Sequence, residues 1–141
     1  MKQLKFFIIS ICALLAAACQ SSDLYKELPG PISNFVSQYW PNPAIASYSE
    51  PAPGEYEVVV TNGPTLKFDS NYEWTEIDGN GMTLPEVLLF DRLPEKLYNY
   101  LSAGSELDNV FTLVRTPRTI TVTLLNTTVK YDIETQKITQ S

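Results

Sequence analysis

The stretch LPEKLYNYL (residues 93–101) decides the fold, because the chain contains nearly the same stretch once before, as LPGPISNFV (residues 28–36). Each has a proline at its second position, where the first turn of a helix tolerates one, followed by apolar residues at helical spacing. Both predict amphipathic helices; we expect Pro41 to end the first, Gly104 to end the second, and a short helix over residues 84–92. The predicted apolar stripes are Ile32, Phe35, Val36 and Tyr39 in the first helix, and Leu93, Leu97, Tyr100 and Leu101 in the second.

A second pair of similar blocks follows the two helices at nearly the same distance. NGPTLKFDSNYEW (residues 62–74) matches NTTVKYDIETQK (residues 126–137) in its apolar, lysine and aspartate positions. Two pairs of blocks at nearly one offset predict a duplicated unit, with copies at residues 28–78 and 84–139. The DGNG sequence at 78–81 is the predicted boundary between the copies.

After each helix the spacing of the apolar residues changes from helical to alternating. Tyr56, Val58 and Val60 alternate with polar or β-branched neighbours, and Asn62-Gly63 after them is a strong hairpin signal. The predicted strands are residues 44–49, 55–60, 65–69 and 72–77 in the first copy, and 109–115, 119–125, 128–133 and 137–139 in the second. The predicted fold class is therefore α+β, with two tandem repeats. Each repeat is an amphipathic helix followed by a four-stranded antiparallel meander, and the helices pack on one sheet face.

The N-terminus reads as a secretory signal. Residues 1–5 carry two lysines, and residues 6–17 form an apolar run that is too short to span a bilayer and ends in small residues. We therefore expect residues 1–18 to be a signal peptide and the mature protein to be exported.

Cys19 follows LAAA (residues 15–18), which resembles the lipobox of bacterial lipoproteins, although the leucine stands one place further from the cysteine than is usual. The resemblance implies that Cys19 becomes the lipidated first residue, so residues 19–27 are the lipidated cysteine and its tether. Several acyl chains would hold the protein at a membrane surface without a spanning helix. The alternative is ordinary cleavage after the alanine run, which would leave an unmodified thiol.

Removal of the 18 residues of the signal from 141 leaves 123, and the loss of Lys2 and Lys5 moves the net charge from −6 to −8. Such an acidic chain is a poor partner for nucleic acid, which needs a basic surface. Cys12 also leaves with the signal, so Cys19 is the only mature cysteine and no internal disulfide is possible. The stability of the domain must then come from packing, for which 123 residues suffice.

The first copy is similar to a known family. YWPNPAIASYSE (residues 39–50) followed by GEYEVVVTNGPTLKFDSNYEW (residues 54–74) resembles the repeat of the PepSY-like, beta-lactamase-inhibitor-protein-like lipoproteins, which reads "YEV.L.NG..L.FD..G.W". The resemblance implies two helix-plus-four-strand repeats whose helices cover one face of the sheet and leave the other free. The chain departs from the family at Tyr72, where a turn glycine is usual, and in its second copy, which lacks a tryptophan.

The chain has no histidine, which removes the Ser-His-Asp and Cys-His arrangements and the commonest transition-metal ligand. We expect no catalytic residues, no metal site and no cofactor. Among the acidic residues, Glu55 and Glu57 fit a solvated sheet face better than a catalytic pair. The DGNG sequence fits a turn better than a calcium loop. Asp69 and Asp132 recur at strand ends, where a carboxylate accepts backbone hydrogen bonds.

A binding role has two sets of candidates. Trp40 and Trp74 could anchor a partner, but tryptophans at a helix end or in a strand more often close a core. The better candidate is the sheet face away from the helices, although an antiparallel sheet often has one solvated face with no ligand. Its predicted residues are Glu55, Glu57, Val59, Lys67, Thr119, Thr121, Thr123 and Lys130.

The leading hypothesis is a non-enzymatic, lipid-anchored protein of the bacterial cell envelope, periplasmic or surface-facing, that binds a protein or peptide ligand on this face. The family resemblance suggests an inhibitor-like version of that role. Two alternatives stay open: a hydrolase that uses carboxylates on envelope glycans, and a structural subunit of an envelope complex.

Overall fold

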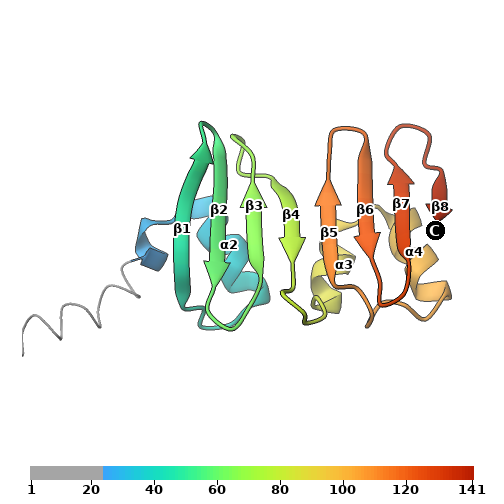
Figure 1. Cartoon of the computed structure of the whole chain (residues 1–141), viewed down its shortest axis with the longest axis horizontal. Coiled ribbons are helices and arrows are strands. Elements are labelled where there is room, and N and C mark those ends of the chain that lie inside the picture. The colour runs from blue at the N-terminus through green and yellow to red at the C-terminus, as the bar shows by residue number, and fades with distance from the viewer. Residues whose placement is uncertain (1–23) are drawn as a thin grey trace, which may run out of the picture.

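The computed structural model describes residues 24–141, which form one eight-stranded antiparallel sheet with helices against it (Figure 1). The fold is therefore α+β, as the sequence predicts. The predicted signal peptide, residues 1–18, and the predicted lipidation site, Cys19, lie outside the described residues. Within residues 24–141, none of the helices has the length and apolar character needed to cross a membrane.

The strands lie in the sheet in the order in which they occur in the chain, β1 to β8. A helical turn at residues 24–27, which the sequence predicts as part of the tether, precedes the first full helix and packs on the core through Leu24 and Tyr25. The helices are α2 (Gly30–Tyr39), α3 (Glu86–Arg92) and α4 (Glu95–Ala103). The strands are β1 (Ile45–Ala52), β2 (Glu55–Val60), β3 (Thr65–Phe68), β4 (Trp74–Asp78), β5 (Thr112–Arg115), β6 (Thr119–Thr123), β7 (Thr128–Asp132) and β8 (Ile138–Gln140).

Every predicted strand is present, with shifts at some ends. The strand expected from residue 109 begins at Thr112, because the carbonyls of Val110 and Phe111 accept hydrogen bonds from Leu84 and Gly79 in the linker before α3. The predicted hairpin at Asn62-Gly63 joins β2 to β3 through a four-residue loop, residues 61–64. Asn62 has a positive φ of 55°, and the Gly63 N–H donates to the Val60 carbonyl oxygen at 3.0 Å. Tyr72, at the place of the family's turn glycine, also has a left-handed φ of 61°.

The helices end close to where the sequence predicts, but one residue predicted to be buried is exposed. α2 buries its predicted stripe and ends at Tyr39, just before Pro41. α4 ends at Ala103 with Gly104 as its cap, although the residue with the left-handed φ is Ser105, at 58°. The prediction that Tyr100 is buried is wrong: the ring is exposed, and its hydroxyl donates a hydrogen bond to Gln140.

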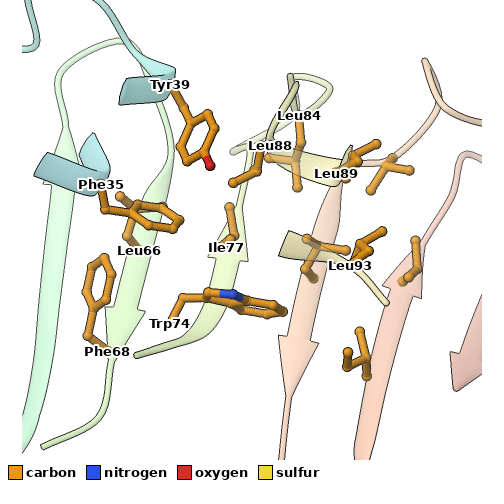
Figure 2. Close-up of a cluster of buried hydrophobic side chains, with 14 of the residues drawn as sticks. Phe35, Tyr39, Leu66, Phe68, Trp74, Ile77, Leu84, Leu88, Leu89 and Leu93 are labelled. Carbon is orange, nitrogen blue, oxygen red and sulfur yellow. The ribbon is translucent and has the colours of Figure 1, made fainter. Parts of the chain in front are cut away.

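The core lies between the helices and one face of the sheet (Figure 2). Phe35 of α2 meets Phe68 of β3 edge to face, with ring centroids 5.4 Å apart. Leu88 and Leu89 of α3 are fully buried between the two halves of the molecule. All buried side chains among residues 24–141 are hydrophobic, so apolar burial is the main source of stability.

β4 and β5 join the first four strands to the last four. Only three residue pairs form this ladder: Glu76 with Val114, Ile77 with Leu113, and Asp78 with Thr112. Immediately beyond the ladder, Arg115 donates hydrogen bonds from Nε and Nη2 to the Trp74 carbonyl oxygen, at 2.9 and 2.6 Å. Its guanidinium carbon also lies 4.9 Å from the centre of the Trp74 ring. Arg115 thus extends a short ladder by both hydrogen bonding and cation–π contact.

We call the contact between the first four and the last four strands the junction. A second arginine joins α3 to α2 across it. Arg92, at the end of α3, donates from Nε to the Tyr39 hydroxyl of α2 at 2.9 Å, and its guanidinium carbon lies 4.8 Å from the Phe35 ring centre. Tyr39 in turn donates to Asp91 at 2.8 Å. Burial, followed by the hydrogen bond to Asp91, raises the pKa of Tyr39 above its usual value, so the hydroxyl stays a donor at neutral pH.

The contacts of Arg115 at the β4–β5 junction predict that even a substitution that keeps its positive charge lowers the free energy of unfolding. Arg115→Lys retains a cation but loses the planar stack on Trp74 and the paired donors, so we expect unfolding in urea to show a loss of about 1–2 kcal/mol. The control is Arg118→Lys, because Arg118 is an exposed arginine paired with Glu134. The control should change stability by less than about 0.5 kcal/mol. Equal effects of the two substitutions would contradict the role given to Arg115.

Candidate functional site

The three helices all lie behind the sheet, and the opposite face carries no other element of residues 24–141 (Figure 1). We call this uncovered side the open face. In β2, Val58 and Val60 are buried on the helix side, while Glu57 and Val59 alternate with them and stay at least partly exposed. The same alternation in β6 puts Ile120 and Val122 in the core. All eight residues of the predicted binding face lie on the open face: Glu55, Glu57, Val59, Lys67, Thr119, Thr121, Thr123 and Lys130.

The strand register arranges the open face in rows that run across all or most of the sheet. The first row is Ser49, Glu57, Lys67, Glu76, Val114, Thr121, Lys130 and Thr139. The second is Ser47, Val59, Thr65, Asp78, Thr112, Thr123 and Thr128. Charged groups dominate the first row over β2 to β4, whereas hydroxyl groups dominate the second row over β5 to β7.

The predicted residues form two groups rather than one. Glu57 and Lys67 are direct cross-strand neighbours in the first four strands, and Thr121 and Lys130 are neighbours in the last four. Three interstrand steps of about 4.8 Å separate Lys67 from Thr121, so about 14 Å lie between the groups. A ligand that contacts both groups must therefore be an extended one.

Sequence reasoning missed the residues that bridge these groups, which are Glu76 of β4 and Val114 of β5. A β-bulge explains the first omission. Lys67 pairs with Glu76 but Phe68 pairs with Trp74, so Thr75 is an extra residue in β4. Because of this bulge, Trp74 and Ile77 are both buried although they are three residues apart, and the alternation that would have marked Glu76 as an open-face residue is broken.

The charges in the first row are partly paired. Lys67 Nζ lies 2.9 Å from Glu76 Oε2, and this hydrogen bond, together with the nearby charges of Glu76, Glu57 and Glu55, raises the pKa of Lys67 above its usual value. The lysine side chain is about half exposed, so such a pair contributes at most about 1 kcal/mol. Its main effect is to engage the charge of Lys67 with Glu76, so that Lys67 offsets less of the negative charge of Glu55 and Glu57 nearby.

A shallow hollow of about 360 Å³ opens at this acidic end of the face. Its polar lining comes from Glu55, Glu57, Lys67, Asp69 and Thr75. In the part of the chain that the structure describes, no carboxyl group is buried. The hollow therefore offers surface carboxylates for contact with a ligand, without the desolvated acid of a glycosidase-type site.

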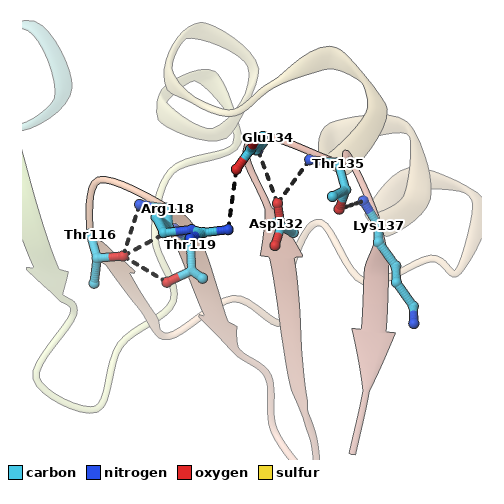
Figure 3. A network of polar contacts seen from close by, with 7 residues as sticks. All are labelled: Thr116, Arg118, Thr119, Asp132, Glu134, Thr135 and Lys137. Atoms are coloured by element: carbon cyan, nitrogen blue, oxygen red, sulfur yellow. Dashed lines mark hydrogen bonds and ion pairs between the residues drawn. The ribbon is translucent and has the colours of Figure 1, made fainter.

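The two aspartates at strand ends are turn residues, as predicted. Asp69 Oδ1 accepts the backbone N–H groups of Asn71 and Glu73, at 2.9 and 3.1 Å. Asp132 Oδ1 accepts those of Glu134 and Thr135, at 3.0 and 2.8 Å (Figure 3). These bonds satisfy backbone donors that the tight turns leave without a ladder partner.

The turn after β7 also changes the acidity of its aspartate. The backbone N–H of Thr135, with further help from its hydroxyl, from Glu134 N–H and from the Arg118 charge, lowers the pKa of Asp132 below its usual value. Thr116 makes the neighbouring β5–β6 turn in a similar way, since its hydroxyl accepts the backbone N–H groups of Arg118 and Thr119 (Figure 3).

The lowered pKa gives a pH prediction. A depressed folded-state pKa adds stability above the usual aspartate pKa, and this contribution is lost as the pH falls through the folded value. We therefore expect Asp132→Asn to be less stable than the native chain at pH 7, with the difference shrinking between about pH 4 and pH 2. Urea midpoints at pH 7, 4 and 2 measure it. Asp108→Asn, at an exposed aspartate outside these turns, is the control and should show a small, constant difference. A difference at Asp132 that does not change with pH would contradict the assignment.

The two tryptophans and the DGNG sequence, which were the other candidates for a functional role, have core or turn roles in the structure. Trp74 is buried in the core, the position that its sequence context favours over a partner-binding one, and Trp40 is half-buried against the core. The DGNG sequence is a turn, in which Asp78 Oδ1 accepts Asn80 N–H at 2.9 Å, and Asn80 Nδ2 ties the linker to the Gly63 carbonyl at 3.0 Å. Over residues 24–141, no three acidic or cysteine side chains come together as metal ligands would.

Solved structures of three Bacteroides proteins share this fold. One is a protein of the DUF2874 family from Bacteroides vulgatus ATCC 8482, proposed to be periplasmic, with a TM-score of 0.68 and 23% identity over 83% of this chain and 92% of that chain. Another is a protein from Bacteroides thetaiotaomicron, proposed to be calcium-regulated and periplasmic, with a TM-score of 0.67 and 23% identity over the same shares. A third, also from Bacteroides vulgatus ATCC 8482, is proposed to be periplasmic and is of unknown function; it has a TM-score of 0.64 and 20% identity over 82% of this chain and 93% of that chain.

At these identities the likeness establishes the fold and not the chemistry. Neither a protein-family model nor a curated protein matches the chain. The chain is thus similar in fold to bacterial proteins proposed to be periplasmic.

Proposed function

We propose that the protein is a non-enzymatic, lipid-anchored protein of the bacterial cell envelope that binds a protein or peptide on the open face. One observation carries the proposal: eight strands form one sheet whose helices all cover the same side. The free side has rows of charged and hydroxyl groups long enough for an extended ligand, which fits recognition through side chains of alternating spacing.

The envelope location rests on the leader and the fold. The basic start, short apolar run and LAAA-Cys19 sequence resemble those of an exported lipoprotein. Proteins of the same fold that are proposed to be periplasmic support this location. The acyl chains would act as the membrane anchor.

We also propose that the sheet arose from two copies of one unit, as the resemblance to the PepSY-like lipoproteins implies. Two features support this. Leu-Pro precedes both α2 and α4, and four strands follow each of these helices. Asp69 and Asp132, at matching places in the two copies, each accept two backbone N–H groups of the turn that follows, two and four residues on for Asp69 and two and three residues on for Asp132. The open face is then two meanders that share one junction.

The absence of catalysis is supported by the chemistry of the face. The chain has no histidine, and the carboxylates that line the acidic hollow are at the surface. A carboxylate-dependent hydrolase needs one acid with a raised pKa in a partly apolar site. The hollow is therefore better suited to contact with basic or hydroxyl groups of a ligand.

A specific observation favours one second candidate, a structural subunit of an envelope complex. On the helix side, Val87 and Phe90 of α3 are 62% and 68% exposed, and Phe90 packs edge to face on Tyr98. Exposed apolar side chains that lie together mark contact surfaces more often than single ones do. A partner held through α3 would leave the open face free.

The binding proposal predicts that charge reversal on the open face removes a partner. Glu57→Arg with Thr121→Arg alters both groups of the face without touching the core. We expect at least a tenfold loss of that partner in pull-downs from envelope extract, measured by quantitative mass spectrometry. The matched control, Glu95→Arg with Ser102→Arg, makes the same change in charge on the exposed side of α4.

Equal recovery of the same partners by the native chain and the open-face variant would argue against the open face. Loss only with the α4 control, or with Phe90→Ser, would instead favour the structural-subunit candidate.

The anchor has its own prediction. Cys19→Ser removes the thiol that would be acylated, so we expect the protein to move from the membrane fraction to the soluble fraction. Cys12→Ser, a substitution of the same kind within the signal, should leave the protein in the membrane fraction. Membrane retention of the Cys19 variant would refute lipid anchoring.

A further inference from the structure

We propose that the β1 end of the sheet faces the lipid bilayer and that the β8 end is the outermost part of the molecule. This inference rests on the proposed anchoring at Cys19. It adds a membrane-facing surface, made by residues 24–27 and the free edge of β1, and a direction for the open face.

The length of the tether limits how far the domain can stand from its anchor. Four residues, 20–23, separate Cys19 from Leu24, where the described structure begins. Five backbone steps of at most about 3.6 Å bring Leu24 to within about 18 Å of the acylated cysteine. A domain on so short a tether keeps its point of attachment next to the lipid headgroups.

The point of attachment is at one end of the sheet. The helical turn at residues 24–27 lies beyond β1, and the C-terminus lies at β8, at the opposite end (Figure 1). This turn is part of the packed domain, because Leu24 and Tyr25 contact the core. The Tyr25 hydroxyl also donates to the Ser33 carbonyl oxygen at 3.2 Å, and the Leu28 N–H donates to the Tyr25 carbonyl oxygen. The anchor therefore holds the β1 end itself and not a long arm attached to it.

When the sheet stands with β1 next to the bilayer, β8 is too far away to contact the lipid headgroups. Seven interstrand steps of about 4.8 Å separate β1 from β8, which is about 34 Å. The folded domain cannot enter the bilayer, so only orientations that point β8 away from it or along its surface remain. On average, β8 therefore lies away from the membrane. A net charge of −8 on the mature chain adds repulsion from anionic headgroups and opposes lying flat.

This orientation also accounts for the two free edges of the sheet. The outer edge of β1 is eight residues long, so its unpaired backbone groups could accept a strand from another chain. A bilayer close to that edge would hinder such pairing. β8 has only three residues, so the outward edge offers little for strand addition. The open face stands between the two edges, accessible along its whole length.

The test compares two positions in the same row of the open face. Ser49 of β1 and Thr139 of β8 are both exposed, and they lie at opposite ends of the first row. Ser49→Cys and Thr139→Cys, each in the acylated protein purified from membranes, take a thiol-reactive fluorophore at that position only, because acylation blocks Cys19. The proteins are reconstituted in phosphatidylethanolamine–phosphatidylglycerol vesicles that contain headgroup nitroxide lipid. We expect at least threefold stronger quenching at position 49 than at 139.

A longer tether is the matched control. Insertion of 20 Gly/Ser residues after Asp23 gives a linker with a root-mean-square length of about 27 Å, which should bring the two quenching values to within about 1.5-fold of each other. An undiminished difference with the long linker would contradict the tether as the cause. Equal quenching with the native tether, in protein that floats with the vesicles, would overturn the orientation alone. Protein that does not float with the vesicles would overturn the anchor and, with it, the orientation.

Discussion

The pairing of β4 with β5 is the contact on which the rest of the structure depends. Three residue pairs join two groups of four strands, and without them each group would expose a new edge and part of the core beneath α3. Two arginines reinforce this short ladder, both from the C-terminal half and both on aromatic rings of the N-terminal half. Arg115 acts within the sheet and Arg92 between the helices. The guanidinium group suits both places, because it gives planar stacking and several donors at once.

The continuity of the sheet gives the open face its character. Either half alone would present four strands, with the acidic hollow in one and the hydroxyl rows in the other. Joined at β4–β5, they form one surface in which an acidic region leads into a hydroxyl-rich region that carries Lys130. Such a surface favours a ligand with unlike ends, since its two parts offer different chemistry at fixed separation. The buried side has no such variation, because its side chains are apolar throughout.

Much of the fold follows from local sequence. The spacing of Ile32, Phe35 and Val36 is enough to place α2 and its buried side, and the alternation in residues 55–60 is enough to orient β2. The eight open-face residues were predictable for the same reason, because a strand has only two sides. Asp69 and Asp132 were predictable as turn residues from their position at strand ends.

Features that depend on the pairing register of the strands, or on contacts between distant residues, could not be predicted from the sequence. The bulge at Thr75 inserts one residue into β4 and thereby hides the role of Glu76, and nothing in the local sequence marks it. Arg92 and Arg115 were not recognised as junction residues, because their partners Tyr39 and Trp74 are 53 and 41 residues away in the chain. Tyr100 fits the helical stripe by spacing, but its ring is exposed and its hydroxyl donates to Gln140 of β8, a contact with a residue 40 positions away that local spacing does not reveal.

The identity of strand order and chain order has a consequence for how the protein folds. Every strand pairs only with strands that are next to it in sequence, so nearly all loops to be closed are short hairpins. Such a topology has a low contact order for an antiparallel sheet, which favours rapid folding. The one long closure is between β4 and β5, across α3 and α4, and it has the largest loop entropy to overcome. A chain that is synthesised from its N-terminus can therefore complete its first four strands before the second four are available, with the β4–β5 junction forming last.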